Sequence, residues 1–62
     1  MQKFWMVYVE GKGAPSRKHQ TKEDAFEEAK RLALQERGRA VILEAVYVAH
    51  LVDEPVVIAA VN

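Results

Sequence analysis

Two long apolar runs constrain the fold of this chain most strongly. The first, "AVILEAVYVAHLV", spans residues 40–52, and the second, "VVIAAV", spans residues 56–61. Asp53, Glu54 and Pro55 between them are turn residues, so the pattern predicts an antiparallel hairpin. As a straight strand, the first run would extend about 43 Å at about 3.3 Å per residue.

The rest of the chain predicts one more strand, a loop and a helix. Residues 3–10, "KFWMVYVE", are rich in aromatic and β-branched side chains and predict a strand. Residues 11–20, "GKGAPSRKHQ", have turn chemistry without a period and predict a loop. A helix is predicted over residues 22–37, with Thr21 as its N-cap because Asp24 follows three residues later.

The predicted helix carries one apolar stripe. Its members recur at spacings of one, three and four residues and are Ala25, Phe26, Ala29, Leu32 and Ala33. Leu34 points away from this stripe, so we expect it to be a single exposed leucine or an interface contact. Gly38 is expected to end the helix. The element order β-α-β-β predicts an α+β fold: a single domain over residues 1–62, with a three-stranded, mainly antiparallel sheet packed on one helix.

The predicted strands lack a polar face. Strand 3–10 places Trp5, Val7 and Val9 on one side and Phe4, Met6 and Tyr8 on the other. The run 40–52 has only Glu44 and His50 as polar residues. A single helix covers one face of a sheet, and the other face of an antiparallel sheet normally alternates with polar residues. One broad apolar face is therefore left uncovered.

This uncovered face predicts self-association. Covering about 600 Å² of apolar surface contributes on the order of 15 kcal/mol before association costs. We expect an oligomer, most simply a two-fold dimer with sheets stacked face to face. The end of the long strand and the last strand could instead project as an arm onto a neighbour. The residues expected in the interface are Trp5, Val7, Leu34, Tyr47, His50 and Val57.

The composition argues against several classes of protein. The chain has 62 residues and no cysteine, which excludes a disulfide or zinc-thiolate staple. Two histidines do not form a metal cluster, so no metal and no cofactor are expected. A net charge of zero argues against a general nucleic-acid binder. No apolar run is long enough to span a bilayer and no signal peptide is recognisable, so a cytoplasmic protein without membrane contact is expected.

The basic loop is the main candidate for a polar site. Lys12, Ser16, Arg17, Lys18 and His19 precede the helix N-terminus, where unpaired backbone N–H groups favour anions. Acidic residues in the first helical turn oppose this role, and the loop matches no phosphate-binding motif. A solvated connector is the alternative. His19 is expected to be exposed or packed over the helix start, and His50 to be a packed or interface histidine.

The segments "MVYVEGKGAPSRKHQTKEDAFEEAKRLA" and "VILEAV" resemble a group of short, uncharacterised bacteriophage and prophage proteins. The resemblance covers about residues 4–46. It implies an accessory protein made in a bacterial cytoplasm and carries over no catalytic residues. The β-α-β-β order is also similar in outline to the dodecins, flavin-storing oligomers, at the level of fold analogy alone.

No combination of residues in the chain forms a catalytic signature, so no enzyme is expected. We expect a non-enzymatic, self-associating accessory protein that binds a protein partner, with a host factor as one candidate. The alternative is a nucleic-acid or phosphate-ligand binder that uses the loop at residues 12–19.

Overall fold

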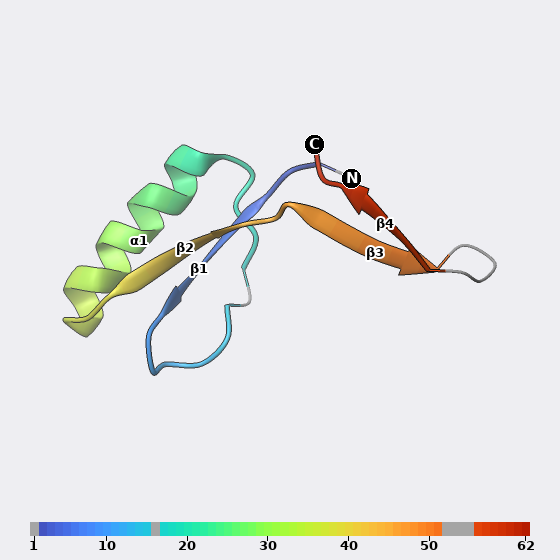
Figure 1. The fold of residues 1–62 in the computed structure, drawn as a ribbon. Helices are drawn as coiled ribbons and strands as arrows, with labels where there is room; N and C mark the ends of the chain where they lie inside the picture. Colours follow the sequence, from blue (N-terminus) through green and yellow to red (C-terminus); the bar gives the residue numbers. More distant parts are fainter. Residues whose placement is uncertain (1, 16, 52–55) are drawn as a thin grey trace.

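The computed structural model describes residues 2–15, 17–51 and 56–62. In this part of the chain, one helix and two pairs of strands form a small α+β structure (Figure 1). The elements in chain order are β1 (Trp5–Val9), α1 (Lys22–Glu36), β2 (Ala40–Glu44), β3 (Tyr47–Leu51) and β4 (Val56–Ala60). The predicted α+β class and the β-α-β start are confirmed.

The predicted three-stranded sheet is wrong. The strands form two separate two-stranded antiparallel sheets, β1–β2 and β3–β4. The long apolar run is interrupted at Ala45 and Val46, which belong to neither strand. Strand β1 pairs with β2 alone, whereas β4 pairs with β3 alone. Strand β1 therefore pairs with the first part of the apolar run, and β4 pairs with the second part. In the part of the chain described, no residue of β2 or β3 has a partner strand on both sides.

The antiparallel pairing of β3 with β4 agrees with the predicted hairpin. Tyr47 lies opposite Ala60, and Leu51 lies opposite Val56. The predicted turn at residues 53–55 lies outside the described residues. Figure 1 shows this hairpin extending away from the rest of the molecule, which we call the body (β1, α1 and β2). We call β3 and β4 the arm.

The arm makes the molecule elongated. The Cα atoms extend over 46 × 23 × 13 Å, and their radius of gyration is 14.1 Å. A compact domain of this length has a radius of gyration of about 11 Å. In the described chain, helix α1 packs against β1 and β2, and the strands of the arm pack only against each other. The projecting arm agrees with the alternative drawn from the sequence, and its packing on a neighbour stays a prediction.

Backbone hydrogen bonds continue each sheet by one residue pair toward the junction of the body and the arm, and one further bond connects the segments on either side of it. The Ala45 N–H donates to the Phe4 carbonyl at 3.0 Å, and the Val61 N–H donates to the Val46 carbonyl at 2.8 Å. The Lys3 N–H donates to the carbonyl of Asn62. The Val61 side chain is buried at this junction. The hydrogen bond between Lys3 and Asn62 therefore connects the segment after β4 to the segment before β1.

The core lies between α1 and one face of the β1–β2 sheet. Val7, Ala25 and Ala29 are buried at its centre. Trp5, Leu32, Ala40 and Ile42 pack around them. Two alanines spaced four residues apart allow the helix to approach the sheet closely. Phe26, which the predicted stripe included, is 42% exposed because it lies about 100° further around the helix.

The N-terminus of α1 is capped as predicted. The Thr21 hydroxyl oxygen accepts a hydrogen bond from the Asp24 backbone N–H at 3.1 Å. The C-terminus differs from the expectation, because the left-handed residue is Arg37, with φ 52° and ψ 49°. Gly38 follows it, and both backbone N–H groups donate to the Ala33 carbonyl. The helix therefore ends one residue earlier than predicted.

We predict that Arg37→Gly raises the free energy of unfolding by about 0.5–1 kcal/mol, because glycine adopts positive φ without the Cβ clash. Chemical denaturation measures the change. Gly38→Ala is the matched control, since a Cβ at Gly38 would meet Val9 Cγ1 at 3.7 Å and the Glu36 carbonyl at 3.8 Å, which are ordinary contacts. Gly38→Ala should leave the stability unchanged or raise it slightly. A loss of stability in both variants would place the left-handed residue at position 38 and contradict this assignment.

Candidate functional site

The basic loop starts with a turn that requires glycine. Gly11 has φ 81° and Gly13 has φ 101°, both in the region that side chains rarely adopt. Between them, the Lys12 N–H donates to the Val9 carbonyl at 3.0 Å. The loop then returns to β1, where His19 and Trp5 exchange backbone hydrogen bonds of 2.8 and 2.9 Å. Both ends of the loop are thereby fixed on β1.

The predicted anion-binding cations do not converge on one point. Lys12 Nζ lies 3.5 Å from Glu36 Oε1, at the C-terminal end of α1. Lys18 Nζ lies 4.6 Å from the centre of the Phe4 ring, in a cation–π contact. Arg17 lines a cavity beside acidic residues of α1. Ser16 lies outside the described residues. The cations that are described thus face different acidic or aromatic groups.

His19 has a structural position. Its side chain is buried, with 8% exposure, and its backbone forms the bridge to Trp5. The expectation of an exposed histidine is wrong, and the alternative of a packed one agrees with the structure. The side chain faces two adjacent cavities between the loop and α1.

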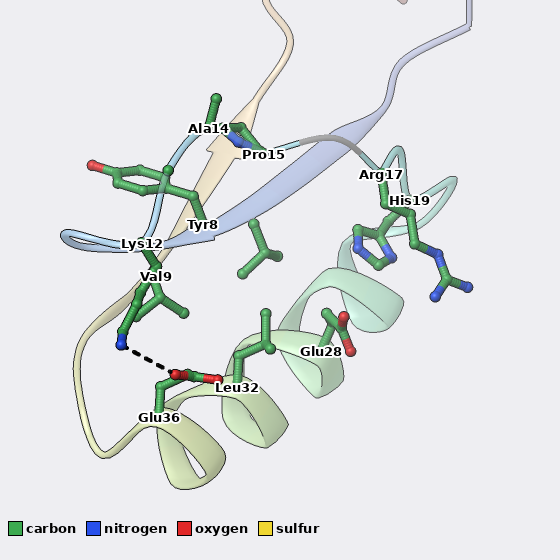
Figure 2. Close-up of a pocket in the computed structure, with 12 residues that line it drawn as sticks. Tyr8, Val9, Lys12, Ala14, Pro15, Arg17, His19, Glu28, Leu32 and Glu36 are labelled. Carbon is green, nitrogen blue, oxygen red and sulfur yellow. Dashed lines mark ion pairs between the residues drawn. The ribbon is translucent and has the colours of Figure 1, made fainter.

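The first cavity has a volume of about 400 Å³ and lies between β1, the basic loop and α1 (Figure 2). Val7, Val9 and Leu32 contribute its apolar lining. Its charged lining combines Lys12, Arg17 and His19 with Glu28 and Glu36. Figure 2 shows the Lys12–Glu36 ion pair at one end of this cavity and Arg17 at the other. Charges of both signs therefore line it.

The second cavity, of about 480 Å³, is also lined by charges of both signs. Arg17, His19 and Arg31 face Asp24, Glu27 and Glu28. Arg31 donates to both carboxylate oxygens of Glu28, at 2.8 and 2.9 Å, and to Gln35 Oε1 at 2.9 Å. This cavity offers no uniformly positive surface to an anion. The mixed charges support the connector interpretation of the loop.

The forked contact with Arg31 holds the pKa of the Glu28 carboxyl below its usual value. The hydrogen bonds from Arg31 are the main cause, and the positive charge of Arg17 acts in the same direction. Lys3 lowers the pKa of Glu44 in the same way, with the Trp5 indole N–H as a further donor at 3.3 Å. Both carboxyls are thus held in their charged form by neighbouring donors.

Within the described ranges, no group of three or more His, Cys, Asp and Glu side chains could hold a metal ion. Nor does any helix there combine the length and apolar character needed to cross a membrane.

The predicted interface residues in the body differ in accessibility. Val7 is buried beneath α1, so its side chain belongs to the core of the body. Trp5 is half-buried on the same face of the sheet, with its indole N–H directed at Glu44. Leu34 is 81% exposed, as expected for a side chain away from the stripe. Only Leu34 of these three presents its side chain fully to solvent.

The arm presents an apolar surface on each of its faces. Opposed residues of the two strands share a face, and one face consists of Tyr47, Ala49, Leu51, Val56, Ile58 and Ala60. We call it the arm face. The other face carries Val48, His50, Val57 and Ala59, so His50 is its one polar side chain. Two of the predicted interface residues, His50 and Val57, lie directly opposite each other.

The arm face is exposed throughout. Tyr47, Leu51 and Ile58 are 69%, 67% and 70% exposed, and Val56 is 59% exposed. Such contiguous apolar surfaces on small proteins mark sites of association. The arm face is the strongest candidate functional surface in the described structure.

Two features of the structure were not visible in the sequence. The lack of a polar face on the strands indicated an uncovered face, but nothing in "LEAVYV" signals the interruption at Ala45 and Val46. The cavities beside the basic loop were also missed. They depend on where the loop returns to β1, which local sequence does not determine.

We predict that Glu28→Gln lowers the free energy of unfolding at neutral pH by about 0.3–0.5 kcal/mol, a value typical of pairs on a helix surface. Because the folded-state pKa is lowered, this contribution is complete above the ordinary pKa of 4.5 and is lost as the pH falls through the folded-state value. Denaturation at several pH values measures it. In an Arg31→Gln background, Glu28→Gln should have almost no effect. An unchanged effect there would contradict the pairing.

The comparisons with known proteins concern the body. A family model described as "Uncharacterized protein conserved in bacteria (DUF2188)" matches residues 1–45, which span β1, α1 and β2. No curated protein and no solved structure matches the chain. The expected resemblance is therefore confirmed for an uncharacterised bacterial family, and nothing supports a phage origin. By its match over residues 1–45, the chain belongs to the DUF2188 family of uncharacterised proteins conserved in bacteria.

Proposed function

We propose that this chain is a non-enzymatic, self-associating module whose arm mediates binding between protein chains. The observation that carries the proposal is the arm itself, a two-stranded hairpin that is apolar on both faces apart from His50 and is packed against neither α1 nor the β1–β2 sheet. An isolated two-stranded hairpin is at best marginally stable in water. An arm of this kind therefore requires a partner surface.

The size of the arm face makes association favourable. Its four large exposed residues are Tyr47, Leu51, Val56 and Ile58. Complete burial contributes about 1.5–3 kcal/mol for each such side chain, or on the order of 6–12 kcal/mol together. This gain is comparable with the lower range of association costs. Burial of the matching partner surface adds to it.

The chemistry of the arm face favours an apolar protein partner. The arm face carries no charged side chain, and the chain as a whole has a net charge of zero. Charge repulsion between copies is therefore weak. A second copy of the chain meets the requirement, and a different protein would be recognised by the same apolar face.

The alternative function, anion binding by the basic loop, has less support. Lys12 is paired with Glu36, Lys18 lies over Phe4, and Arg17 lies among acidic residues of α1. An incoming phosphate would have to compete with each of these contacts. We therefore place the function on the arm.

We predict that the wild-type chain sediments as a dimer at micromolar concentration and that Ile58→Asp sediments as a folded monomer. The Ile58 side chain is 70% exposed, so an aspartate there adds a charge to the arm face without disturbing the core. Leu34→Asp is the control, because Leu34 is a largely exposed apolar side chain on α1, at 81%. It should leave the dimer intact. A wild-type chain that is a folded monomer at these concentrations would contradict the proposal.

The same experiment distinguishes the two functions by their salt dependence. Apolar association is maintained or strengthened at high salt, whereas phosphate binding weakens steeply. We predict that the dimer persists when salt is raised, and that Lys12→Ala and Arg17→Ala leave it unchanged. Dissociation of the dimer at high salt would favour a charged interface instead.

A further inference from the structure

We infer that the arm face of one copy packs on the back of the β1–β2 sheet in a second copy, and that the second copy's arm does the same in return. This inference rests on the proposed self-association and names its binding surface. The surface that receives the arm lies on the body, opposite α1. We call it the back face.

The back face consists of Met6, Tyr8, Val41 and Leu43. Met6 lies opposite Leu43, and Tyr8 lies opposite Val41, so the four side chains share one face. Val7 and Ile42 alternate with them and point into the core beneath α1. Figure 2 shows Tyr8 directed away from α1. Leu43 is 42% exposed, and the other three side chains are half-buried.

The back face and the arm face match in chemistry. Neither contains a charged side chain, and the only hydroxyl groups are those of Tyr8 and Tyr47. A charged partner surface would lose its hydration on either face without gaining an ion pair. Each face is therefore best covered by an apolar surface, and the chain contains both.

The two faces also match in length. Strands β1, β2, β3 and β4 are each five residues long. Each paired sheet is therefore roughly 17 Å long and 10 Å wide. The body and the arm lie on either side of the interruption at Ala45 and Val46. A two-fold axis passing near this interruption would bring each arm onto the other copy's back face.

The area to be buried favours this reciprocal contact over a contact between two arms. Contact between two arm faces buries two of these surfaces and leaves both back faces exposed. Reciprocal packing buries four surfaces in one symmetric contact. Only the reciprocal contact approaches the roughly 1,000 Å² of total buried surface that specific interfaces need.

Disulfide cross-linking tests the inference directly, because the wild-type chain contains no cysteine. Leu43→Cys on the back face and Ile58→Cys on the arm face are prepared as separate proteins, mixed and oxidised. Both side chains are partly or largely exposed, so the changes leave the core intact. Circular dichroism and sedimentation verify that each variant folds and associates. Leu51→Cys, at an exposed position of the same face, replaces Ile58→Cys if that variant does not fold.

We expect the mixed Leu43→Cys and Ile58→Cys proteins to form the heterodimeric disulfide at least about tenfold faster than Ile58→Cys mixed with Leu34→Cys. Thiols held together in one assembly have an effective concentration in the millimolar range, far above that of random encounters. Leu34 on α1 provides the background for an exposed position outside the contact.

Three results would overturn the inference. Fastest cross-linking of Ile58→Cys to itself would show contact between two arms. Cross-linking at the background rate in a chain that sediments as a dimer would place the interface elsewhere and leave self-association intact. Background cross-linking in a chain that remains monomeric would overturn both this inference and the proposed function, and would assign the arm to a different molecule.

Discussion

The structure depends on one constraint, which is that a single amphipathic helix can cover one face of one small sheet. In this chain α1 covers the face that contains Val7 and Ile42, and Ala25 and Ala29 provide the close contact. The buried apolar cluster of the body lies in this one layer between α1 and the β1–β2 sheet. The arm face is exposed throughout, and Leu43 on the back face is 42% exposed. The architecture is therefore that of a body with an exposed apolar arm, and the proposed self-association rests on this exposure.

The charged residues form ion pairs on the body, at the basic loop and on α1, and the arm face contains none of them. Lys12 connects the basic loop to the C-terminal end of α1 through Glu36, and Arg31 fixes Glu28 on the helix surface. The return of the loop through His19 extends the pairing of β1. These contacts explain the concentration of polar residues in this part of the sequence without a ligand. They fix the basic loop on α1 and β1.

Much of the local structure could be predicted from the sequence. The cap at Thr21, the strand over β1 and the exposure of Leu34 follow from short-range rules of hydrogen bonding and periodicity. The division into two sheets could not be predicted, because an uninterrupted apolar run gives no signal at Ala45 and Val46. It depends on how far β1 reaches along the run, which is a property of tertiary pairing. The buried position of His19 and the ion pair of Lys12 with Glu36 depend in the same way on long-range contacts.

The family match ends at residue 45, where the body ends and the connection to the arm begins. We propose that the arm is covered by another chain. Amide hydrogen exchange of β3 and β4, measured at protein concentrations below and above the dissociation constant, tests this proposal most directly. We expect exchange in the arm to slow markedly at the higher concentration while exchange in α1 changes little. Equal exchange in the arm at both concentrations would contradict it.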